Sequence, residues 1–274
     1  MKNEIILPEA NKQIETLLSD IRDKHFSEFS DELMLLDSLD TDIQNTRSME
    51  IVNTAIDLKE LMMVYSCAMK EARLKLEIFN TEYKLDYKRN PINSIHARLK
   101  RLASIIEKLE RNNIPFSIEN IEKNIHDVAG LRVICSYVDD IYVIADALKK
   151  QSNIDLIAEK DYIINPKPNG YRSLHLIVNV PVFFTSRIRK MNVEVQIRTI
   201  AMDFWATLEH QLKYRRQLAD SEEIALRLKE CAEIISATDS SMLAIRRQIE
   251  TNSAKPTERE IIFEKMKKID LPIE

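Results

Sequence analysis

The sequence predicts an α/β (α+β) protein whose mixed β-sheet has about four to five strands, flanked by helices and extended by further helices at both ends. Three features predict this class. The chain of 274 residues contains two glycines, and its abundant Leu, Ile, Lys and Glu favour helices, where Gly costs about 1 kcal/mol relative to Ala. Apolar residues recur every three or four positions in the flanking segments. The centre contains runs of β-branched residues.

The N-terminal part is predicted to be mostly helical. Its helices are expected at residues 11–29, about 48–80, 101–113 and 117–125. Asn90-Pro91 separates the second of these helices from the third, because a proline disfavours the helical conformation of the residue before it. Ser117 is the predicted N-cap of the last of these helices.

The centre of the chain is predicted to form the sheet. Strands are expected at residues 128–138, 154–164, 173–184 and 192–199. A helix at residues 139–151, capped by Asp139 or Asp140, connects the first two strands. Further helices are expected at residues 200–217, 221–250 and 257–268. The chain therefore divides into an N-terminal helical extension, a core and C-terminal helices, at residues 1–83, 84–215 and 216–274.

Charge is unevenly distributed along the chain. Residues 1–60 carry 6 basic and 14 acidic side chains, whereas residues 84–111 carry 8 basic and 3 acidic ones. A protein that binds duplex nucleic acid usually has a wider basic face and a higher pI than the value near 5.9 found here. The local basic cluster therefore favours a small polyanion as ligand.

Several classes of protein are disfavoured. We find no apolar leader and no run of about 18 apolar residues, so we expect a cytoplasmic protein without membrane attachment. Three widely spaced cysteines predict neither a disulfide framework nor a zinc site. Two distant glycines exclude a Walker A loop. His126-Asp127 is the dipeptide of metal-dependent phosphohydrolases, but those hold their ligands on helices and here a strand is predicted to follow.

Strand alternation places ionisable side chains together on single faces. Glu194 and Arg198 alternate with Val and Ile in the last predicted strand. His175 and Arg132 alternate in the same way in two other predicted strands. A solvated face of an antiparallel strand would give the same pattern. If the faces coincide, the sheet has an ionisable floor, which is costly unless it serves a function.

Both glycines lie next to candidate site residues. Gly130 follows Asp127 at the entry to a strand, where it permits positive φ or close approach of a ligand. A carboxylate at a strand edge is also well placed to hold Mg²⁺. Gly170 ends the stiff segment PKPNG and presents Tyr171, whose ring suits stacking on a base. The alternative for PKPNG is an ordinary turn.

Three motifs together resemble a known family. HDVAGLRV, EKDYIINPKPNGYRSLHL and VEVQIRTIAMDFWATLEH resemble the RelA/SpoT-type (p)ppGpp synthetase domain in order, spacing and content, over about residues 84–215. The compact chain resembles the stand-alone small alarmone synthetases, without a hydrolase domain. The resemblance implies Mg²⁺-dependent transfer of the β,γ-pyrophosphate of ATP to the 3′-hydroxyl of GDP or GTP, giving ppGpp or pppGpp and AMP.

The resemblance also implies the residues of the catalytic and acceptor sites. Asp127 matches the aspartate that holds Mg²⁺, and Glu194 matches a carboxylate that binds metal or activates the 3′-hydroxyl as a general base. Tyr171 matches the tyrosine that stacks on guanine, while Lys167 and His175 match positions near the acceptor nucleotide and its phosphates. The choice between general base and metal ligand stays open for Glu194.

On the donor side, HARLKRLASIIEKL resembles the family segment that binds ATP. The implied ATP-binding residues are Arg98, which packs against adenine, and the phosphate-binding cations Lys100, Lys108, Arg132 and Lys160. Two positions depart from the family pattern. Ala97 stands where many relatives have Gly. Lys160 stands where many have Arg, which keeps the charge but loses the planar fork.

Further expectations concern the rest of the last motif and the partners. Arg198 and Glu209 are expected to orient neighbours or to pair with each other, and Trp205 to lie in the core. The resemblance implies a homo-oligomer, a tetramer in the small members, and leaves regulation by single-stranded RNA open. The alternatives to an enzyme are a catalytically silent nucleotide- or RNA-binding module on the same fold and a helical assembly factor.

Overall fold

The computed structural model describes residues 46–87, 90–214 and 221–252. Two compact units divide the chain, one containing residues 1–63 and 101–124 and the other residues 64–100 and 125–274. Helices α4 (Leu102–Arg111) and α5 (Ile118–Asn124) belong to the first unit, where they contact each other. Helix α3 (Thr46–Tyr87) begins in the first unit and continues in the second.

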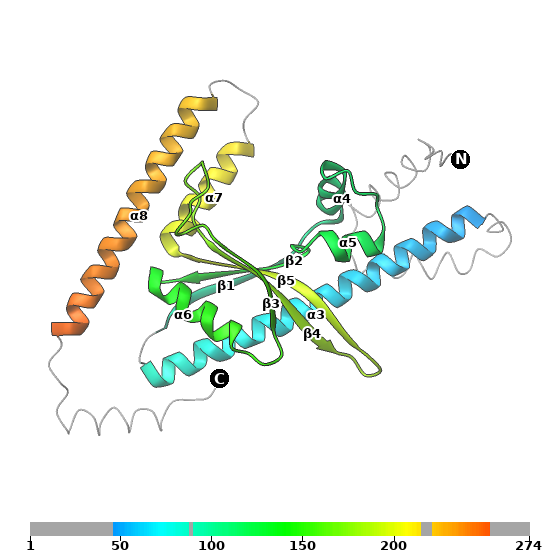
Figure 1. The fold of residues 1–274 in the computed structure, drawn as a ribbon, viewed down its shortest axis with the longest axis horizontal. Helices are drawn as coiled ribbons and strands as arrows, with labels where there is room; N and C mark the ends of the chain where they lie inside the picture. The colour runs from blue at the N-terminus through cyan, green and yellow to red at the C-terminus, as the bar shows by residue number, and fades with distance from the viewer. Residues whose placement is uncertain (1–45, 88–89, 215–220, 253–274) are drawn as a thin grey trace. The chain divides into compact units, whose positions relative to one another are not determined.

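The second unit is built on one mixed sheet of five strands in the order β1-β2-β5-β4-β3 (Figure 1). The strands are β1 (Ile92–Leu99), β2 (Ala129–Cys135), β3 (Asp155–Asp161), β4 (Leu174–Phe183) and β5 (Ile188–Thr199). β2 and β5 are parallel, and the other three neighbouring pairs are antiparallel. The predicted fold class is confirmed.

The two faces of the sheet differ in chemistry. One face is apolar, and its β2, β4 and β5 side chains are at most 1% exposed: Leu131, Val133, Leu174, Leu176, Val178, Val193, Val195 and Ile197. Residues two apart in a strand share a face, so the residues between these valines and leucines point to the opposite side. That opposite face carries the ionisable side chains, as strand alternation predicts.

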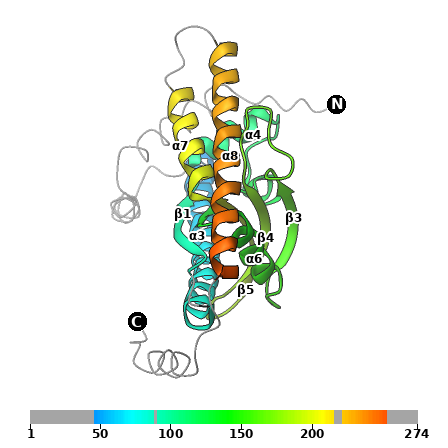
Figure 2. The ribbon, with the colours of Figure 1, turned by 90° about the vertical axis from the view of Figure 1, so that its left-hand side faces the viewer.

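Helices hold the sheet at its ends and against its surface. Helix α6 (Val138–Lys149) connects β2 with β3, contacts β2 and β5, and buries Ile141, Ile144 and Leu148 completely. Helices α7 (Ile200–Tyr214) and α8 (Ser221–Asn252) lie side by side (Figure 2), and the Trp205 indole N–H donates to the Leu228 carbonyl oxygen at 2.8 Å. Trp205 is buried, as predicted.

Strand β1 was not predicted from the sequence. Its sequence, INSIHARL, buries Ile92 but leaves its other residues half-buried or exposed, because β1 is an edge strand. An edge strand of this kind shows no apolar alternation, so the period-2 signal is missing. Arg98 consequently lies on a strand, and the helix of this segment begins only at Leu102.

The predicted helix caps have mixed outcomes. The Asn120 N–H donates to Ser117 Oγ at 3.0 Å, which confirms the N-cap of α5. The prediction that Asp139 or Asp140 caps α6 is wrong, since Tyr137 is the N-cap residue and makes no side-chain capping bond. Both aspartates lie in the first turn of α6, where their negative charge favours the helix N-terminus.

Two predicted helices, at residues 11–29 and 257–268, lie outside the described residues. Within the described part of the chain, no helix combines the length and apolar character needed to cross a membrane.

Candidate active site

A lysine and an aspartate meet where β1 ends and β2 begins. The strands are antiparallel with Leu99 opposite Ala129, so the residues just beyond them are neighbours. Lys100 Nζ donates to Asp127 Oδ2 at 2.7 Å, and both side chains are about three-quarters covered (21% and 25% exposed). The backbone N–H of Lys100 also donates to the carbonyl oxygen of Val128 at 2.8 Å. The bond from Lys100 fixes the Asp127 carboxylate at this end of the sheet.

A second carboxylate, that of Glu194, lies at the same end of the sheet. The parallel register of β2 and β5 places Glu194 opposite Gly130, three residues after Asp127. Gly130 does not have positive φ, so the prediction that glycine is needed here for a left-handed backbone conformation is wrong. Its missing side chain instead leaves the space beside Glu194 open, because a Cβ there would contact only the Arg98 carbonyl oxygen, at 3.6 Å.

Hydrogen bonds hold both oxygens of Glu194. His175 Nδ1 lies 3.1 Å from Oε1, and Gln196 Nε2 donates to Oε2 at 2.8 Å. Burial raises the pKa of Glu194, but the bonds from His175 and Gln196 outweigh it, and the net pKa is below the usual range for a glutamate. Glu194 is therefore a fixed, ionised carboxylate at neutral pH.

His175 connects this carboxylate to Tyr171. The Tyr171 hydroxyl lies 2.9 Å from His175 Nε2, on the other side of the ring from Glu194. The neutral tautomer with hydrogen on Nδ1 satisfies both bonds, since Nδ1 donates to the carboxylate and Nε2 accepts from the hydroxyl. Burial raises the pKa of the Tyr171 hydroxyl, so it remains protonated and can donate.

The PKPNG loop (residues 165–172) presents Tyr171 beside the sheet. Gly170 has φ of +89°, and its N–H donates to the Lys167 carbonyl oxygen at 2.8 Å to close the turn. Asn169 accepts from the Tyr171 N–H at 3.2 Å and donates to Glu209 Oε1 of α7 at 3.0 Å. Gly170 therefore has the positive φ that only glycine adopts readily.

Two tyrosine rings lie beside the side-chain ammonium group of Lys167 in the same loop. The Lys167 ammonium lies 4.6 Å from the Tyr162 ring centroid and 4.9 Å from the Tyr171 centroid. Tyr162 also makes edge contacts with the rings of Tyr171 and His175, at 6.1 and 5.2 Å between centroids. The group combines flat aromatic rings with one cation.

Arginines line the next part of the polar face. Asp203 of α7 lies 3.4 Å from both Arg132 Nη1 and Arg198 Nε. Burial lowers the pKa of Arg198, which nonetheless remains charged, and Arg198 also donates to Gln196 at 3.2 Å. The expectation that Arg198 orients its neighbours is met through Gln196 and Asp203, while Glu209 accepts from Asn169.

The predicted ATP-binding residues are not all in one place. The register of β1 places Arg98 opposite Gly130, near Lys100 and beside the strand of Arg132. Lys160 lies opposite His175 on β3, at the other edge of the sheet. Four interstrand steps of about 4.8 Å separate these two edges by about 19 Å. Lys108 lies on α4, in the other compact unit.

The predicted acceptor residues Lys167, Tyr171 and His175 are brought together by the PKPNG loop and β4. Lys160 shares their side of the sheet through its pairing with His175.

The donor atoms present fit a magnesium ion shared with a nucleotide. Among the described residues, no group of three or more His, Cys, Asp or Glu could enclose a metal. Mg²⁺ usually binds proteins through one or two carboxylates and takes its other oxygens from water and substrate phosphates. Asp127 and Glu194 supply such a pair, and the Asp127 charge acts on the pKa of Glu194.

Sequence reasoning missed Tyr162, Asn169 and Asp203 as parts of this site. Tyr162 and Asn169 lie in the same motif as Tyr171, so proximity in sequence was an available signal. Asp203 is brought to the arginines by the first turn of α7, and no sequence pattern indicates that contact.

The arrangement can bind two anionic groups next to a pair of carboxylates. Cations lie on both sides of Glu194, with Arg98, Lys100 and Arg132 on the β1–β2 side and Lys160 and Lys167 on the β3–β4 side. On the β3–β4 side, the rings of Tyr162 and Tyr171 next to Lys167 can receive a flat heterocycle. Positioning and charge neutralisation are what phosphoryl-group transfer requires of a protein.

Comparisons with known proteins agree with this chemistry. The family model described as "Region found in RelA / SpoT proteins" matches residues 97–219. The GTP pyrophosphokinase YwaC of Bacillus subtilis is 39% identical over 209 residues, which are 76% of this chain and all of that protein. The GTP pyrophosphokinase YjbM of the same organism is 37% identical over 196 residues, covering 72% of this chain and 92% of that protein.

Solved structures show the same fold. The small alarmone synthetase 1 of Bacillus subtilis bound to pppGpp superposes with a TM-score of 0.65 at 37% identity, covering 70% of this chain and 97% of that one. The same synthetase bound to AMPCPP gives a TM-score of 0.60 at 34% identity, covering 71% and 98%.

Proposed function

The chain belongs to the RelA/SpoT family, and we propose that it is a GTP pyrophosphokinase, a small alarmone synthetase that makes ppGpp or pppGpp for stringent-response signalling. The 3′-oxygen of GDP or GTP forms a bond to the β-phosphorus of ATP. The bond from that phosphorus to the oxygen bridging to the α-phosphate breaks, AMP leaves, and the hydroxyl proton is released. The observation that carries the proposal is the pair Asp127 and Glu194 at one end of a polar sheet face with cations on both sides.

The acceptor nucleotide is assigned to the β3–β4 side. We propose that guanine stacks on the Tyr171 ring and that Lys167 binds the acceptor phosphates. The Tyr171–His175–Glu194 hydrogen bonds support this, because they fix the ring at a set distance from the carboxylate. Lys160, which was predicted to bind ATP, fits the acceptor side better by its pairing with His175.

ATP is assigned to the β1–β2 side. Arg98 packs against adenine in this proposal, and Lys100 and Arg132 meet the triphosphate. The positions of Arg98 and Lys100 at the end of β1 support the first two assignments. Because Lys100 bonds to Asp127, a triphosphate that binds Lys100 also lies next to the carboxylate pair.

Asp127 and Glu194 are proposed as the Mg²⁺ ligands. When bound there, Mg²⁺ would neutralise phosphate charge and favour attack by the hydroxyl. The lowered pKa of Glu194 supports a ligand rather than a general base, because the best base has a pKa near the operating pH. His175 and Gln196 keep the carboxylate in one orientation for that purpose.

The function is tested by incubating purified protein with Mg²⁺, γ-labelled ATP and GDP or GTP, and then separating the nucleotides. We expect labelled guanosine tetra- or pentaphosphate and an equal amount of AMP. A folded protein that binds both nucleotides but forms no labelled guanosine product would instead be the catalytically silent binding module.

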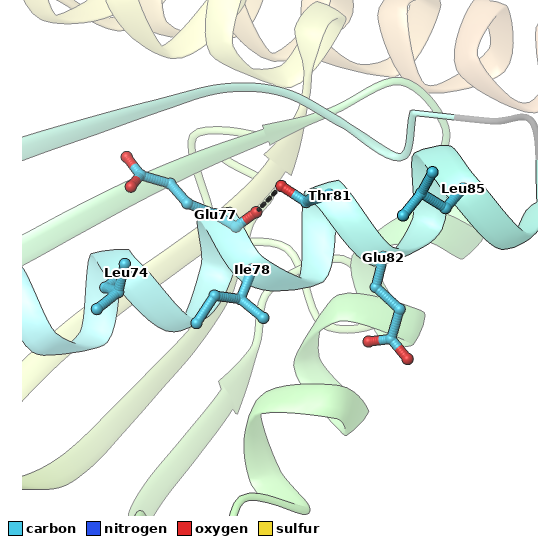
Figure 3. A pocket seen from close by; sticks show the side chains of 6 residues that line it. All are labelled: Leu74, Glu77, Ile78, Thr81, Glu82 and Leu85. Atoms are coloured by element: carbon cyan, nitrogen blue, oxygen red, sulfur yellow. Dashed lines mark hydrogen bonds between the residues drawn. The ribbon is translucent and has the colours of Figure 1, made fainter. Parts of the chain in front are cut away.

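Assembly and location extend the proposal. A homo-oligomer, a tetramer by family resemblance, is supported by exposed apolar side chains along one helix: Leu74, Ile78 and Leu85 of α3 are 52%, 54% and 40% exposed. Together with Glu77, Thr81 and Glu82 they line an open hollow on the surface of α3 (Figure 3). The Thr81 hydroxyl donates to the Glu77 carbonyl oxygen of the preceding turn at 3.0 Å, the bond drawn as a dashed line in Figure 3.

We place the protein in the cytoplasm, where its nucleotide substrates are. We also propose that the chain divides into three parts, at residues 1–83, 84–215 and 216–274.

Single-stranded RNA is proposed as a regulator on family resemblance alone. Addition of single-stranded oligonucleotides to the synthesis assay tests this proposal.

A further inference from the structure

The PKPNG loop contacts helix α8 through two small residues, Gly170 on the loop and Ala232 on the helix. A Cβ built on Gly170 would lie 2.6 Å from the Ala232 Cβ and 3.4 Å from the Lys229 Cα. Carbon atoms in contact are normally about 3.5–4.0 Å apart, so no methyl group fits between loop and helix. The loop backbone therefore rests directly on the methyl group of Ala232, which is 4% exposed.

A second contact ties the loop to the same point of α8. Arg172 Nη1 lies 3.2 Å from the Gly170 carbonyl oxygen and 3.4 Å from the Ala232 carbonyl oxygen. Arg172 thus donates to both sides of the contact. The side chains of Met202 and Trp205 close the space around it from α7.

Helix α8 is itself held at further points along its length. Thr199, the last residue of β5, donates to Asp239 Oδ2 at 2.6 Å. Arg246 donates to Asp139 at 3.2 Å, which ties α8 to the first turn of α6. Trp205 donates to the backbone of Leu228, one turn before Ala232. The surface on which the loop rests is therefore fixed relative to the sheet.

We propose that Ala232 is a positioning residue for the acceptor nucleotide. Its methyl group sets how closely the PKPNG loop approaches α8, and so sets the distance of the Tyr171 ring from His175 and Glu194. A larger side chain at position 232 moves the loop toward the sheet and displaces the ring. The expected effect on enzyme kinetics rests on the proposed function, whereas the contact between the loop and α8 does not depend on it.

The test compares Ala232→Leu with Ala237→Leu. Ala237 lies on the same helix but is exposed, so the same change there adds the same bulk without touching the loop. Misplacement of a binding group by about 1 Å can cost up to about 100-fold in rate. For Ala232→Leu we expect the KM for GDP or GTP to rise by about tenfold or more, with the KM for ATP within about twofold of wild type. For Ala237→Leu we expect both constants to match wild type.

Two further measurements keep the proposal falsifiable. Ala232→Ser adds one heavy atom and should shift the acceptor KM in the same direction by less, in case the Leu variant folds poorly. Amide hydrogen exchange at residues 165–172, with calorimetric titration of GDP, reports loop position and acceptor binding even if the wild type makes no product. We expect faster exchange and weaker GDP binding in both Ala232 variants.

The proposal is overturned if acceptor binding and loop exchange stay at wild-type values in both Ala232 variants. It is also overturned if the two KM values rise equally, because that indicates general loosening of the fold. Absence of product from the wild type would overturn the proposed function alone, since the exchange and GDP-binding comparisons would still decide the role of Ala232.

Discussion

Single side chains set the chemistry of this site through one chain of hydrogen bonds. Tyr171, His175 and Glu194 are joined in series by bonds of 2.9 and 3.1 Å, so the proposed stacking ring and the proposed metal carboxylate have a fixed relation. Gln196 satisfies the remaining oxygen of Glu194. Orientation of this kind is how a protein contributes to a reaction whose main requirements are alignment and charge neutralisation.

Asp127→Asn should abolish synthesis while the fold stays intact. The amide keeps the shape and the bond to Lys100 but removes the charge that Mg²⁺ needs, so we expect synthesis to fall by about 100-fold or more, as when a charge-stabilising group is lost from an active site. Product formation from labelled ATP measures the effect, and circular dichroism checks the fold. Asp155→Asn is the matched control, because Asp155 is exposed and pairs with Lys190 at the surface. Wild-type rates in Asp127→Asn would refute the metal assignment.

The two glycines should respond differently to alanine. Gly170→Ala places a Cβ on a residue with φ of +89° and against Ala232, so we expect a loss of about 1–3 kcal/mol in the free energy of unfolding. Gly130→Ala meets only the Arg98 carbonyl oxygen at 3.6 Å and should fold nearly as well as wild type. Urea denaturation of both variants measures the difference. Equal losses would contradict the assigned backbone roles.

The elements that frame the site are joined at their ends by side chains. Thr199 is the last residue of β5, and its hydroxyl oxygen accepts from the Met202 N–H at 3.1 Å, which caps α7. The same hydroxyl donates to Asp239 of α8 at 2.6 Å. One threonine therefore links the strand that carries Glu194 to two helices.

The Asp239 carboxyl should make stability depend on pH. Burial raises its pKa above the ordinary 3.8, and the bond from Thr199 only partly opposes this. Because its pKa is higher in the folded than in the unfolded chain, the protonated Asp239 carboxyl stabilises the fold. This stabilisation is complete when the pH is below the unfolded-state pKa, and it is lost as the pH rises through the folded-state pKa. Asp239→Asn removes this titration, so the Tm of the variant relative to wild type should rise as the pH increases above about 4. Melting curves across that range test it, and a constant difference would contradict it.

Most elements could be predicted because their patterns are local. The four strands of the centre and the helices α3, α6, α7 and α8 show clear periodicity, and Ser117 carries a recognisable capping signal. β1 could not be predicted, since an edge strand buries little and shows no apolar alternation. The prediction for the α6 cap was wrong because the helix begins at Val138, so Asp139 lies inside its first turn, where it accepts from Arg246.

The site could be predicted in composition but not in geometry. The motifs pointed to Asp127, Glu194 and Tyr171, and alternation placed the ionisable side chains of three strands on polar faces. Which strands are neighbours is a property of the whole sheet. The family resemblance groups Lys160 with Arg98 on the ATP side, whereas the strand order puts the two residues at opposite edges of the sheet.

For the molecule as a whole, the apolar surface of α3 should bind a second copy of the chain. Ile78→Glu puts a charge at the centre of the hollow, so we expect a lower molar mass by size-exclusion chromatography with light scattering. Lys84→Glu, also on an exposed position of α3 but outside the hollow, is the control and should keep the wild-type mass. An unchanged mass in Ile78→Glu would remove α3 as an assembly surface.

The parallel pairing of β2 with β5 has a consequence for how the chain folds. Gly130 and Glu194 are opposite each other although they are about 64 residues apart in sequence, and β3, α6 and β4 lie between them in the chain. Contacts between distant residues form late, because the intervening loop must first be closed at an entropic cost. The helices and the β4–β5 hairpin can form earlier from local contacts. We therefore expect a partly folded chain to form helices and the β4–β5 hairpin before it brings Asp127 and Glu194 together, and to synthesise alarmone only once the sheet is complete.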